Sequence, residues 1–191
     1  MTSKTSLNKG LSKAMLMPKK RATVYLWTGS GWGKTTSALG VALRAIGHGK
    51  NVVIIQFMKG WGDNIGEYRV RHRLAPDYQI YQFGRKEWVN LKNPAKIDKD
   101  LAKKALAFAQ EMAKQKPFLL ILDEVNVAIA TGLISLESVL KFLDKVPKET
   151  TVYLTGRYAH QRLIDRADYV TEVIPIKRPK RYTGAKPGID Y

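Results

Sequence analysis

The segment Thr28–Thr36, TGSGWGKTT, combines the residue types and the spacing that bind phosphate groups. It follows an apolar run at 23–27 and precedes a stretch with helical spacing at 36–43. A strand, a glycine-rich turn ending in Gly-Lys-Thr and a helix form a P-loop, which points backbone N–H groups and the positive end of the helix at phosphate oxygens. Lys34 adds a full positive charge, and the hydroxyl of Thr35 can coordinate magnesium. We therefore expect the chain to bind a nucleotide.

The spacing of this loop differs from the usual G-x-x-x-x-G-K-[ST] pattern, because Thr28 stands where the first glycine is expected. The glycines are instead Gly29, Gly31 and Gly33, which gives the tighter pattern G-x-G-x-G-K-T. A chance glycine-rich turn is the alternative interpretation. The apolar run before the loop and the helical pattern after it argue against that alternative.

Two acidic residues follow a second apolar run. Asp123 and Glu124 come directly after 118–122, the position at which P-loop proteins keep the acidic partner of magnesium. We expect Glu124 to lie nearer the metal, directly or through water, and Asp123 to support it. The candidate metal ligands are therefore Thr35, Glu124 and Asp123. The alternative is that both acids only cap the helix that follows.

Arg157 follows the apolar run at 151–154, so it should reach the same edge of the sheet as the loop. Its planar guanidinium is suited to binding phosphate oxygens. Arg44, farther along the helix after the loop, is a weaker candidate for the same role. An ordinary surface arginine is the alternative for both residues.

Tryptophans lie in three of the expected loops. Trp32 lies inside the phosphate-binding loop, Trp61 in the loop after 52–57, and Trp88 in the long loop after 78–83. Each could border a flat ligand, and packing beneath a loop is the alternative role.

These candidates need a scaffold that brings the ends of several strands together. Apolar runs alternate with helical segments, which indicates a parallel sheet with right-handed crossovers and ligands at the carboxyl ends of its strands. We expect the α/β P-loop NTPase (RecA-like) fold, a mostly parallel central sheet with helices on both faces. Residues 23–191 would form a single P-loop nucleotide-binding domain after a basic N-terminal segment, 1–22. The expected strands are 23–27, 52–57, 78–83, 118–122, 151–154 and 169–174, and the expected helices are 36–43, 67–74, 95–116, 136–143 and 161–166.

The composition restricts the class of protein further. The chain has 191 residues, of which 45% are hydrophobic, enough for one domain with a core. No apolar run approaches the ~20 residues that span a bilayer, and residues 1–22 lack the compact apolar stretch of a secretory signal. With no cysteine, the chain cannot use disulfides, thiolate catalysis or cysteine-based metal sites. We expect a cytoplasmic protein that does not enter a membrane.

The charge is strongly positive, with 33 Lys and Arg against 16 Asp and Glu and a net charge of +17. No acidic residue precedes Asp63. Such a field attracts polyanions, whether a triphosphate, a nucleic acid or an acidic partner. The alternative is that the positive charge is an adaptation for solubility or heat stability and binds no ligand.

Taken together, the motifs resemble those of the P-loop ATP:corrinoid adenosyltransferases over about 24–191. The tightened loop Gly29–Thr36 is itself a mark of that family. Each match is weak alone, but their order and spacing make the resemblance specific. The further matching segments are Arg44–Lys50, Gln56–Gly60, Gly66-Glu67, Ile121–Asn126, Leu154–Arg157, Ala167-Asp168 and Gly188–Tyr191.

The resemblance implies a reaction in which the cobalt of a reduced corrinoid, as Co(I), attacks the 5′ carbon of ATP and releases triphosphate. ATP and the corrinoid would be substrates and Mg²⁺ a cofactor, and no protein nucleophile is needed. Lys34, Glu124 and Arg157 would be the catalytic residues, which stabilise the leaving triphosphate or hold magnesium. Ligand contacts would come from Gly29, Ser30, Gly31, Trp32, Gly33, Lys34, Thr35, Thr36, Arg44 and Trp88.

One loop departs from the pattern of the family. Aromatic residues after the third strand help in the family to strip cobalt of its lower ligand, in a Gly-Phe-Thr-Trp sequence. This chain has GRKEW at Gly84–Trp88, so the phenylalanine is absent and the tryptophan lies one position later. Two residues are candidates for this role: Trp88, and Phe83 as a substitute that approaches from the other side.

The resemblance also implies partners. A separate reduced flavin or flavoprotein would supply electrons to the corrinoid. Residues 1–22 would cover the site of a partner subunit in a homodimer, and a flexible segment is the alternative for them.

Two other functions stay open at this point. One is a P-loop ATPase that binds nucleic acid through its basic surface, although no known recognition module is present to support nucleic-acid binding. The other is a nucleotide-dependent binding protein without turnover. The products distinguish the three functions. The adenosyltransferase gives triphosphate and an adenosylated corrinoid, the ATPase gives ADP and phosphate, and the binding protein leaves ATP intact.

Overall fold

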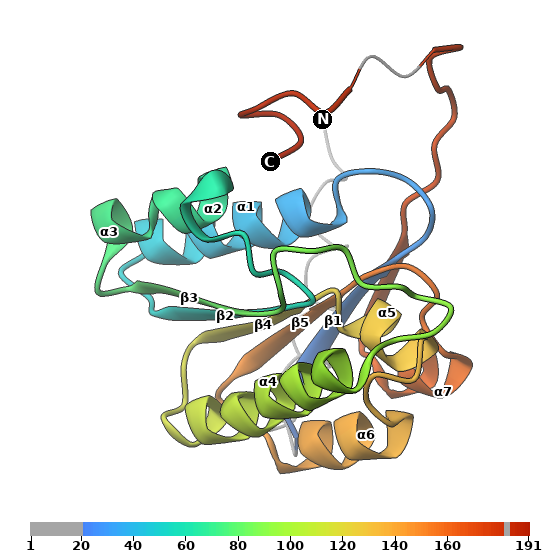
Figure 1. Ribbon diagram of the computed structural model, residues 1–191. Helices are drawn as coiled ribbons and strands as arrows, with labels where there is room; N and C mark the ends of the chain where they lie inside the picture. Colours follow the sequence, from blue (N-terminus) through green and yellow to red (C-terminus); the bar gives the residue numbers. More distant parts are fainter. Residues whose placement is uncertain (1–20, 182–183) are drawn as a thin grey trace, which may run out of the picture.

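A 6-stranded sheet forms the centre of the molecule, and every pair of neighbouring strands in it is parallel (Figure 1). The computed structural model describes residues 21–181 and 184–191, so the expectations for residues 1–20 lie outside its described part. The expected α/β fold with a parallel sheet is confirmed. Across the sheet the strands are β3 (Tyr78–Phe83), β2 (Val52–Phe57), β4 (Leu119–Asp123), β5 (Thr151–Thr155), β1 (Thr23–Thr28) and β6 (Tyr169–Glu172).

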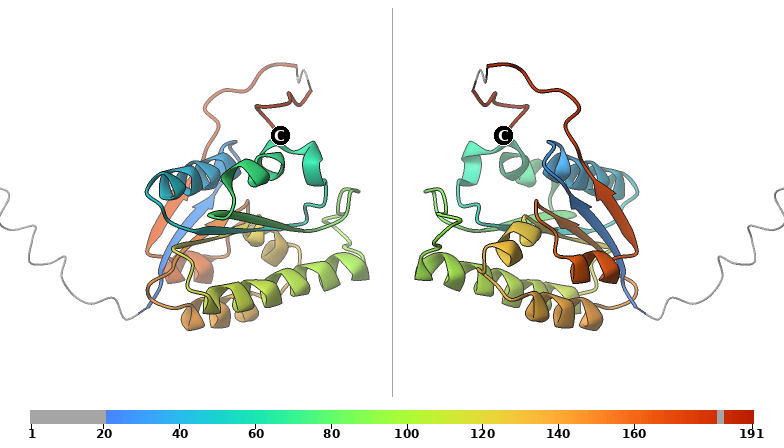
Figure 2. Two further views of the ribbon diagram at one scale, coloured as in Figure 1. Left: turned by 90° about the vertical axis from the view of Figure 1, so that its left-hand side faces the viewer. Right: turned by 90° about the vertical axis from the view of Figure 1, so that its right-hand side faces the viewer.

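Helices cover both faces of the sheet, as Figures 1 and 2 show from three sides. Each connection between parallel strands crosses one face of the sheet, and because such crossovers are right-handed, the face changes when the chain reverses its direction across the sheet. One face carries α1 (Lys34–Gly47), the 3-10 turn η1 (Gly62–Asn64), α2 (Gly66–Arg69) and α3 (Arg71–Leu74). The opposite face carries α4 (Lys96–Lys114), α5 (Val125–Ala130), α6 (Leu136–Lys145) and α7 (Gln161–Arg166).

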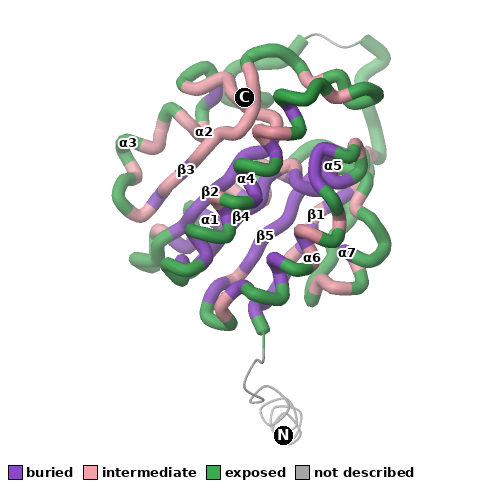
Figure 3. The backbone as a smooth tube through the Cα atoms, turned by 60° about the horizontal axis from the view of Figure 1, so that its bottom comes forward, coloured by how far each residue is buried: buried purple, intermediate pink, exposed green. Residues whose placement is uncertain are grey.

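The central strands β2 and β4 are buried along their whole length (Figure 3). Their side chains meet helices on both faces, which explains why their sequences are continuous apolar runs rather than alternating ones. Small residues let the helices approach closely: Ala38, Ala42 and Ala45 of α1 lie in the core on one face. On the other face, the buried alanines of α4 join a larger core with side chains of α5, α6 and α7.

Several boundaries differ from those expected. α5 (Val125–Ala130) is absent from the expected elements, because its short, mainly apolar sequence resembles a continuing strand. Glu124 takes a positive φ of 64° at the end of β4 and turns the run into a helix. The expected helix at 67–74 is divided into α2 and α3, and α1 begins at Lys34, earlier than expected.

The strands place their carboxyl ends at one edge of the sheet, where the expected site lies. β1 ends at Thr28 before the glycine-rich loop, β4 ends at Asp123, and β5 ends at Thr155. β6 pairs with β1 at the border of the sheet, and all of its residues are exposed. Among the described residues, no helix has the length and apolar character needed to cross a membrane.

The core predicts a contrast between two leucine substitutions. Leu120 in β4 is 0% exposed, whereas Leu43 on α1 is 60% exposed. Leu120→Ala should lower the free energy of unfolding by about 2–5 kcal/mol, because it removes buried methyl groups and leaves a cavity. Leu43→Ala is the control and should change it by about 0.5 kcal/mol or less. Urea unfolding followed by circular dichroism measures both, and equal losses would contradict the burial of β4.

Candidate functional site

The glycine-rich loop is held in shape by the chain that leaves β6. The N–H of Gly31 donates to the carbonyl oxygen of Val173 at 2.7 Å, and the N–H of Val173 donates to the carbonyl oxygen of Thr28 at 2.9 Å. A Cβ atom on Gly29 would lie 2.4 Å from the Val173 carbonyl oxygen, and one on Gly31 would lie 2.7 Å from a Val173 methyl carbon. Glycine is required at both positions because another backbone segment passes too close for a side chain.

The helix α1 begins directly after this loop. Gly33 precedes its first residue with a φ of 94°, which glycine adopts without strain. The first N–H groups of a helix have no partner inside it, so they are free to bind an anion. Lys34 is buried, and its ammonium donates to the carbonyl oxygen of Gly31. Burial lowers the pKa of Lys34, and the charge of Glu124 opposes this shift.

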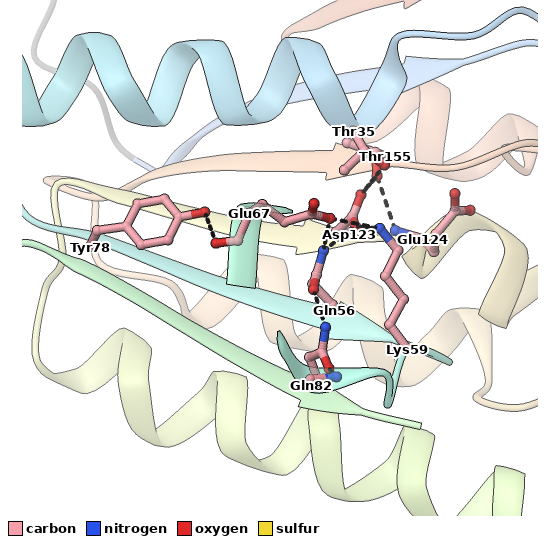
Figure 4. A network of polar contacts seen from close by, with 10 residues as sticks. Thr35, Gln56, Lys59, Glu67, Tyr78, Gln82, Asp123, Glu124 and Thr155 are labelled. Atoms are coloured by element: carbon pink, nitrogen blue, oxygen red, sulfur yellow. Dashed lines mark hydrogen bonds and ion pairs between the residues drawn. The ribbon is translucent and has the colours of Figure 1, made fainter. Parts of the chain in front are cut away.

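Asp123 is the centre of a network of polar contacts at the end of β4 (Figure 4). Its side chain is 1% exposed. Its Oδ1 accepts hydrogen bonds from the hydroxyls of Thr35 at 2.8 Å and Thr155 at 2.7 Å. Its Oδ2 accepts one from the amide of Gln56 at 3.1 Å and lies 2.9 Å from the Nζ of Lys59. Both oxygens are therefore occupied by groups from α1, β5, β2 and the loop after β2.

Lys59 lies between two carboxylates. Its Nζ is 2.9 Å from Asp123 and 3.5 Å from Glu67. Burial disfavours its charged form, but the charges of Asp123 and Glu67 outweigh burial, so the pKa of Lys59 is raised. Burial would raise the pKa of Asp123, yet Lys59 and the hydrogen bonds from Thr155 and Thr35 hold it below its ordinary value. The two groups form a buried ion pair.

Two glutamines extend this network across the sheet. Gln82 of β3 is in register with Gln56 of β2, which is in register with Asp123 of β4. The amide of Gln82 donates to the carbonyl oxygen of Gln56 at 2.9 Å. The carbonyl oxygen of Gln82 accepts a hydrogen bond from the N–H of Gly62 at 2.8 Å. The network therefore connects the loop after β2 to the carboxylate at the centre.

Glu124 has different surroundings from its neighbour, and Figure 4 shows its carboxylate pointing away from Asp123. The positive φ of Glu124 is uncommon for a residue other than glycine, and such conformations cluster at functional sites. Within the described residues its carboxylate accepts no hydrogen bond. Burial and the charge of Asp123 raise the pKa of Glu124. This carboxylate is therefore available for a cation, whereas that of Asp123 is already occupied.

A cavity of about 190 Å³ lies over the glycine-rich loop. It brings together most of the residues that the sequence predicted, including Glu124 and the exposed Arg157 after β5. Gly29 and Ser30 lie outside its lining, since Gly29 packs against Val173 and the carbonyl oxygen of Ser30 accepts a hydrogen bond from Arg178 at 3.3 Å. The lining residues are Gly31, Trp32, Gly33, Lys34, Thr35, Thr36, Glu124, Arg157, Ile189 and Asp190.

A larger cavity of about 400 Å³ adjoins the first and shares Glu124, Arg157 and Asp190 with it. Trp88 is 83% exposed, and its ring lies against that of Trp61 with the centroids 4.9 Å apart. The structure thus places Trp61 and Trp88 in the wall of this larger cavity, whereas Trp32 lines the smaller one. Much of the remaining wall is apolar or aromatic, including Met58, Ile65, Val89, Leu91 and Tyr158.

The loops that carry these tryptophans are in direct backbone contact. A Cβ atom on Gly60 would lie 2.4 Å from the carbonyl oxygen of Gly84, and one on Gly84 would lie 2.3 Å from the carbonyl carbon of Met58. The indole N–H of Trp61 donates to the carbonyl oxygen of Lys86 at 2.7 Å. The loop after β2 and the loop after β3 therefore form one wall.

An ion pair ties the loop after β3 to α4. Arg85 donates from Nε and Nη2 to the two carboxylate oxygens of Asp98, at 2.8 and 3.1 Å. The side chain of Asp98 is 2% exposed and also accepts a hydrogen bond from the N–H of Ala95 at 3.2 Å. The hydrogen bond from Arg85 lowers the pKa of Asp98. Arg85 directly follows Gly84, the point at which this chain departs from the Gly-Phe-Thr-Trp sequence.

Two predicted residues lie away from the cavities. The ring of Phe83 packs against Phe108 of α4, with the centroids 5.4 Å apart, and does not line the larger cavity. The expectation that Phe83 replaces the missing phenylalanine is therefore wrong. Arg44 is exposed in the last turn of α1, so the structure does not bring it to the loop at the first turn.

Sequence reasoning did not assign a role to several residues of the network. Gln56, Lys59, Glu67 and Thr155 surround Asp123, yet they entered only as parts of matching segments. One signal was present in the sequence: Gln56 is a polar residue inside the otherwise apolar run Val52–Phe57. A buried amide in a central strand requires partners, and these partners lead to the site.

The family model and the curated relatives that match this chain indicate the same family. The model of the family described as ATP:corrinoid adenosyltransferase BtuR/CobO/CobP matches residues 20–191. The corrinoid adenosyltransferase CobA of Salmonella typhimurium is 35% identical over 181 residues, which cover 91% of this chain and 87% of that protein. The corrinoid adenosyltransferase of Escherichia coli K12 is 33% identical over 174 residues, which cover 90% and 87%. Among solved structures, that of C. elegans PCH-2 gives a TM-score of 0.44 at 17% identity, over 80% of this chain and 35% of that one, too weak a likeness to build on.

The contact between the two loops predicts that a methyl group added at Gly84 disturbs the tryptophans, whereas one added at a glycine with free space does not. Gly84→Ala should force the loops apart and weaken the interaction between Trp61 and Trp88, because the new Cβ overlaps the backbone of Met58 and Lys59. Near-ultraviolet circular dichroism of the tryptophans measures the change. Gly40→Ala is the matched control, since nothing lies within 4 Å of its Cβ and alanine favours a helix. An unchanged spectrum for Gly84→Ala would show that the loops are not packed as described.

Proposed function

Because the chain belongs to the ATP:corrinoid adenosyltransferase family, we propose that it transfers the 5′-deoxyadenosyl group of ATP to the Co(I) of a reduced corrinoid. One observation supports this proposal more than any other. A cavity over a phosphate-binding loop adjoins a larger, mainly apolar cavity with two tryptophans in its wall, and the two share Glu124, Arg157 and Asp190. A nucleotide and a large flat ligand would meet at this junction.

The reaction requires positioning and charge stabilisation rather than a protein nucleophile. The electron pair of Co(I) forms a bond to the 5′ carbon of ATP, and the bond from that carbon to the triphosphate oxygen breaks. The triphosphate leaves with the electron pair of the broken bond. The protein therefore contributes by holding the reacting atoms together and by binding the charge that develops on the leaving group.

Positive groups around the smaller cavity would bind the triphosphate. The ammonium of Lys34 donates a hydrogen bond to the carbonyl oxygen of Gly31, and it can exchange this acceptor for a phosphate oxygen. Arg157 lines both cavities, and its guanidinium offers a planar pair of donors. The N–H groups at the start of α1 add an oriented set of dipoles.

Thr35 and Glu124 would hold magnesium. The Thr35 hydroxyl donates its hydrogen to Asp123, which leaves its lone pairs for a cation, and the Glu124 carboxylate has no hydrogen-bond partner among the described residues. Asp123 orients Thr35 and is not itself a direct ligand, because both of its oxygens are occupied. Bound Mg²⁺ would neutralise part of the triphosphate charge.

Trp88 and Trp61 would border the corrinoid. Removal of the lower cobalt ligand needs a bulky group beneath the ring, and Trp88 lies in the loop that carries this role in the family. We infer that Trp61, in ring contact with Trp88, fills the position left by the missing phenylalanine. A reduced flavin or flavoprotein as electron donor and a homodimer are further parts of the proposal, and sedimentation velocity tests the dimer.

An anaerobic assay with MgATP and chemically reduced cobalamin tests the function. The expected result is the spectrum of adenosylcobalamin, which bleaches in light, with one triphosphate formed for each corrinoid consumed. ADP and phosphate with an unchanged corrinoid would instead indicate the nucleic-acid-binding ATPase, and addition of DNA or RNA would then test for stimulation. ATP that stays intact with every partner would indicate a binding protein.

Lys34→Ala should reduce the rate of transfer by roughly 100-fold or more, because the variant loses a charge on the leaving triphosphate. Initial rates over a range of ATP concentrations give kcat and KM separately. Lys104→Ala is the matched control, since Lys104 is exposed on α4, which packs on the face of the sheet opposite α1. Near-normal turnover by Lys34→Ala would contradict the proposed triphosphate site.

A further inference from the structure

Lys59 connects the wall of the larger cavity to the network around Asp123. The chain leaves β2 through Met58, whose φ of 61° is rare for a residue with a side chain and costs conformational free energy. This turn directs Lys59 back toward the sheet, where its ammonium lies 2.9 Å from Asp123 and 3.5 Å from Glu67 (Figure 4). Lys59 also lines the larger cavity, but not the smaller one over the glycine-rich loop.

We propose that Lys59 is a positioning residue that fixes the metal-binding hydroxyl and the tryptophan wall relative to each other. Lys59 holds Thr35 through Asp123. Lys59 also holds Trp61, through the backbone of the residues that follow Lys59. The proposal builds on the proposed function, because it assigns the two cavities to MgATP and a corrinoid.

Charge supports the link to Thr35. The side chains of Asp123 and Glu67 are 1% and 13% exposed, and within the part of the chain that the structure describes Lys59 is the cation that contacts both. If the ammonium is removed, two poorly solvated carboxylates repel each other without a counter-charge. Asp123 would then shift, and the Thr35 hydroxyl that donates to it at 2.8 Å would lose its fixed orientation.

Chain connectivity supports the link to the tryptophan wall. Gly60, next to Lys59, is in backbone contact with Gly84, and Trp61 follows directly with its hydrogen bond to Lys86 and its ring against Trp88. No flexible linker separates Lys59 from these contacts. The position of its ammonium therefore restrains the wall of the larger cavity.

Arg85 offers a matched control for this argument. It restrains the same wall from the side of α4, through its ion pair with Asp98. Neither residue takes part in the contacts of Asp123 or Thr35. A substitution of Arg85 should therefore disturb the wall and leave the magnesium site intact.

The experiment compares Lys59→Met with Arg85→Met, using two measurements that need no turnover. The first is the Mg²⁺ concentration that half-saturates ATP binding, measured by calorimetry, and the second is the near-ultraviolet circular dichroism of the tryptophans. Lys59→Met should raise the magnesium midpoint by about tenfold or more and change the spectrum. Arg85→Met should change the spectrum and leave the midpoint within about twofold of the wild type.

A wild-type magnesium midpoint in Lys59→Met would overturn the link to Thr35, and an unchanged spectrum would overturn the link to the wall. If this variant does not fold, the double variant Lys59→Met, Glu67→Gln removes one acid together with the cation and is judged by the same two criteria. Lys59→Arg, which keeps the charge, should recover most of the magnesium affinity. Absence of adenosyl transfer by the wild type would refute the proposed function, but it would not alter either measurement.

Discussion

Burial of the Asp123 carboxylate is the constraint on which the site depends. A charged group removed from water is stable only if hydrogen bonds and an opposite charge replace its hydration. Here the replacements come from α1, β5, β2 and the loop after β2, through Thr35, Thr155, Gln56 and Lys59. These elements cannot move independently while the carboxylate is satisfied. The network therefore fixes the start of the P-loop helix against the sheet.

The same constraint separates the roles of two adjacent acids. Asp123 and Glu124 are chemically similar, but the pKa of Asp123 is lowered by its partners, whereas that of Glu124 is raised by burial and by the charge of Asp123. The left-handed backbone at Glu124 turns its side chain out of the network and toward the cavities. One acid is used for architecture, and the other is left for ligands.

Much of the fold could be predicted from the sequence, because buried parallel strands are continuous apolar runs and a glycine-rich loop marks its own position. α5 could not, since the left-handed turn at Glu124 that starts it has no signal in Val125–Ala130. The site was predicted where strand ends carry charged residues, and missed where a side chain reaches across loops, as Lys59 does. The prediction for Phe83 was wrong, although the alternation of side chains along a strand could have corrected it. Gln82 faces the network, so its neighbour Phe83 must face α4. Arg44 lies ten residues beyond Lys34, about 15 Å along a helix, which is too far for the loop.

The contact between the glycine-rich loop and Val173 has a consequence for synthesis on the ribosome. The loop follows β1, the first strand of the chain, whereas the segment that braces the loop follows β6, the final strand of the sheet. In the sheet β1 pairs with β5 and β6, so it has no neighbouring strand until β5 has been translated and lacks its second neighbour until β6 follows. The amino-terminal part of the nascent chain thus carries the phosphate-binding sequence before it can have the phosphate-binding shape. Nucleotide affinity should arise late in translation, when the last strand joins the sheet.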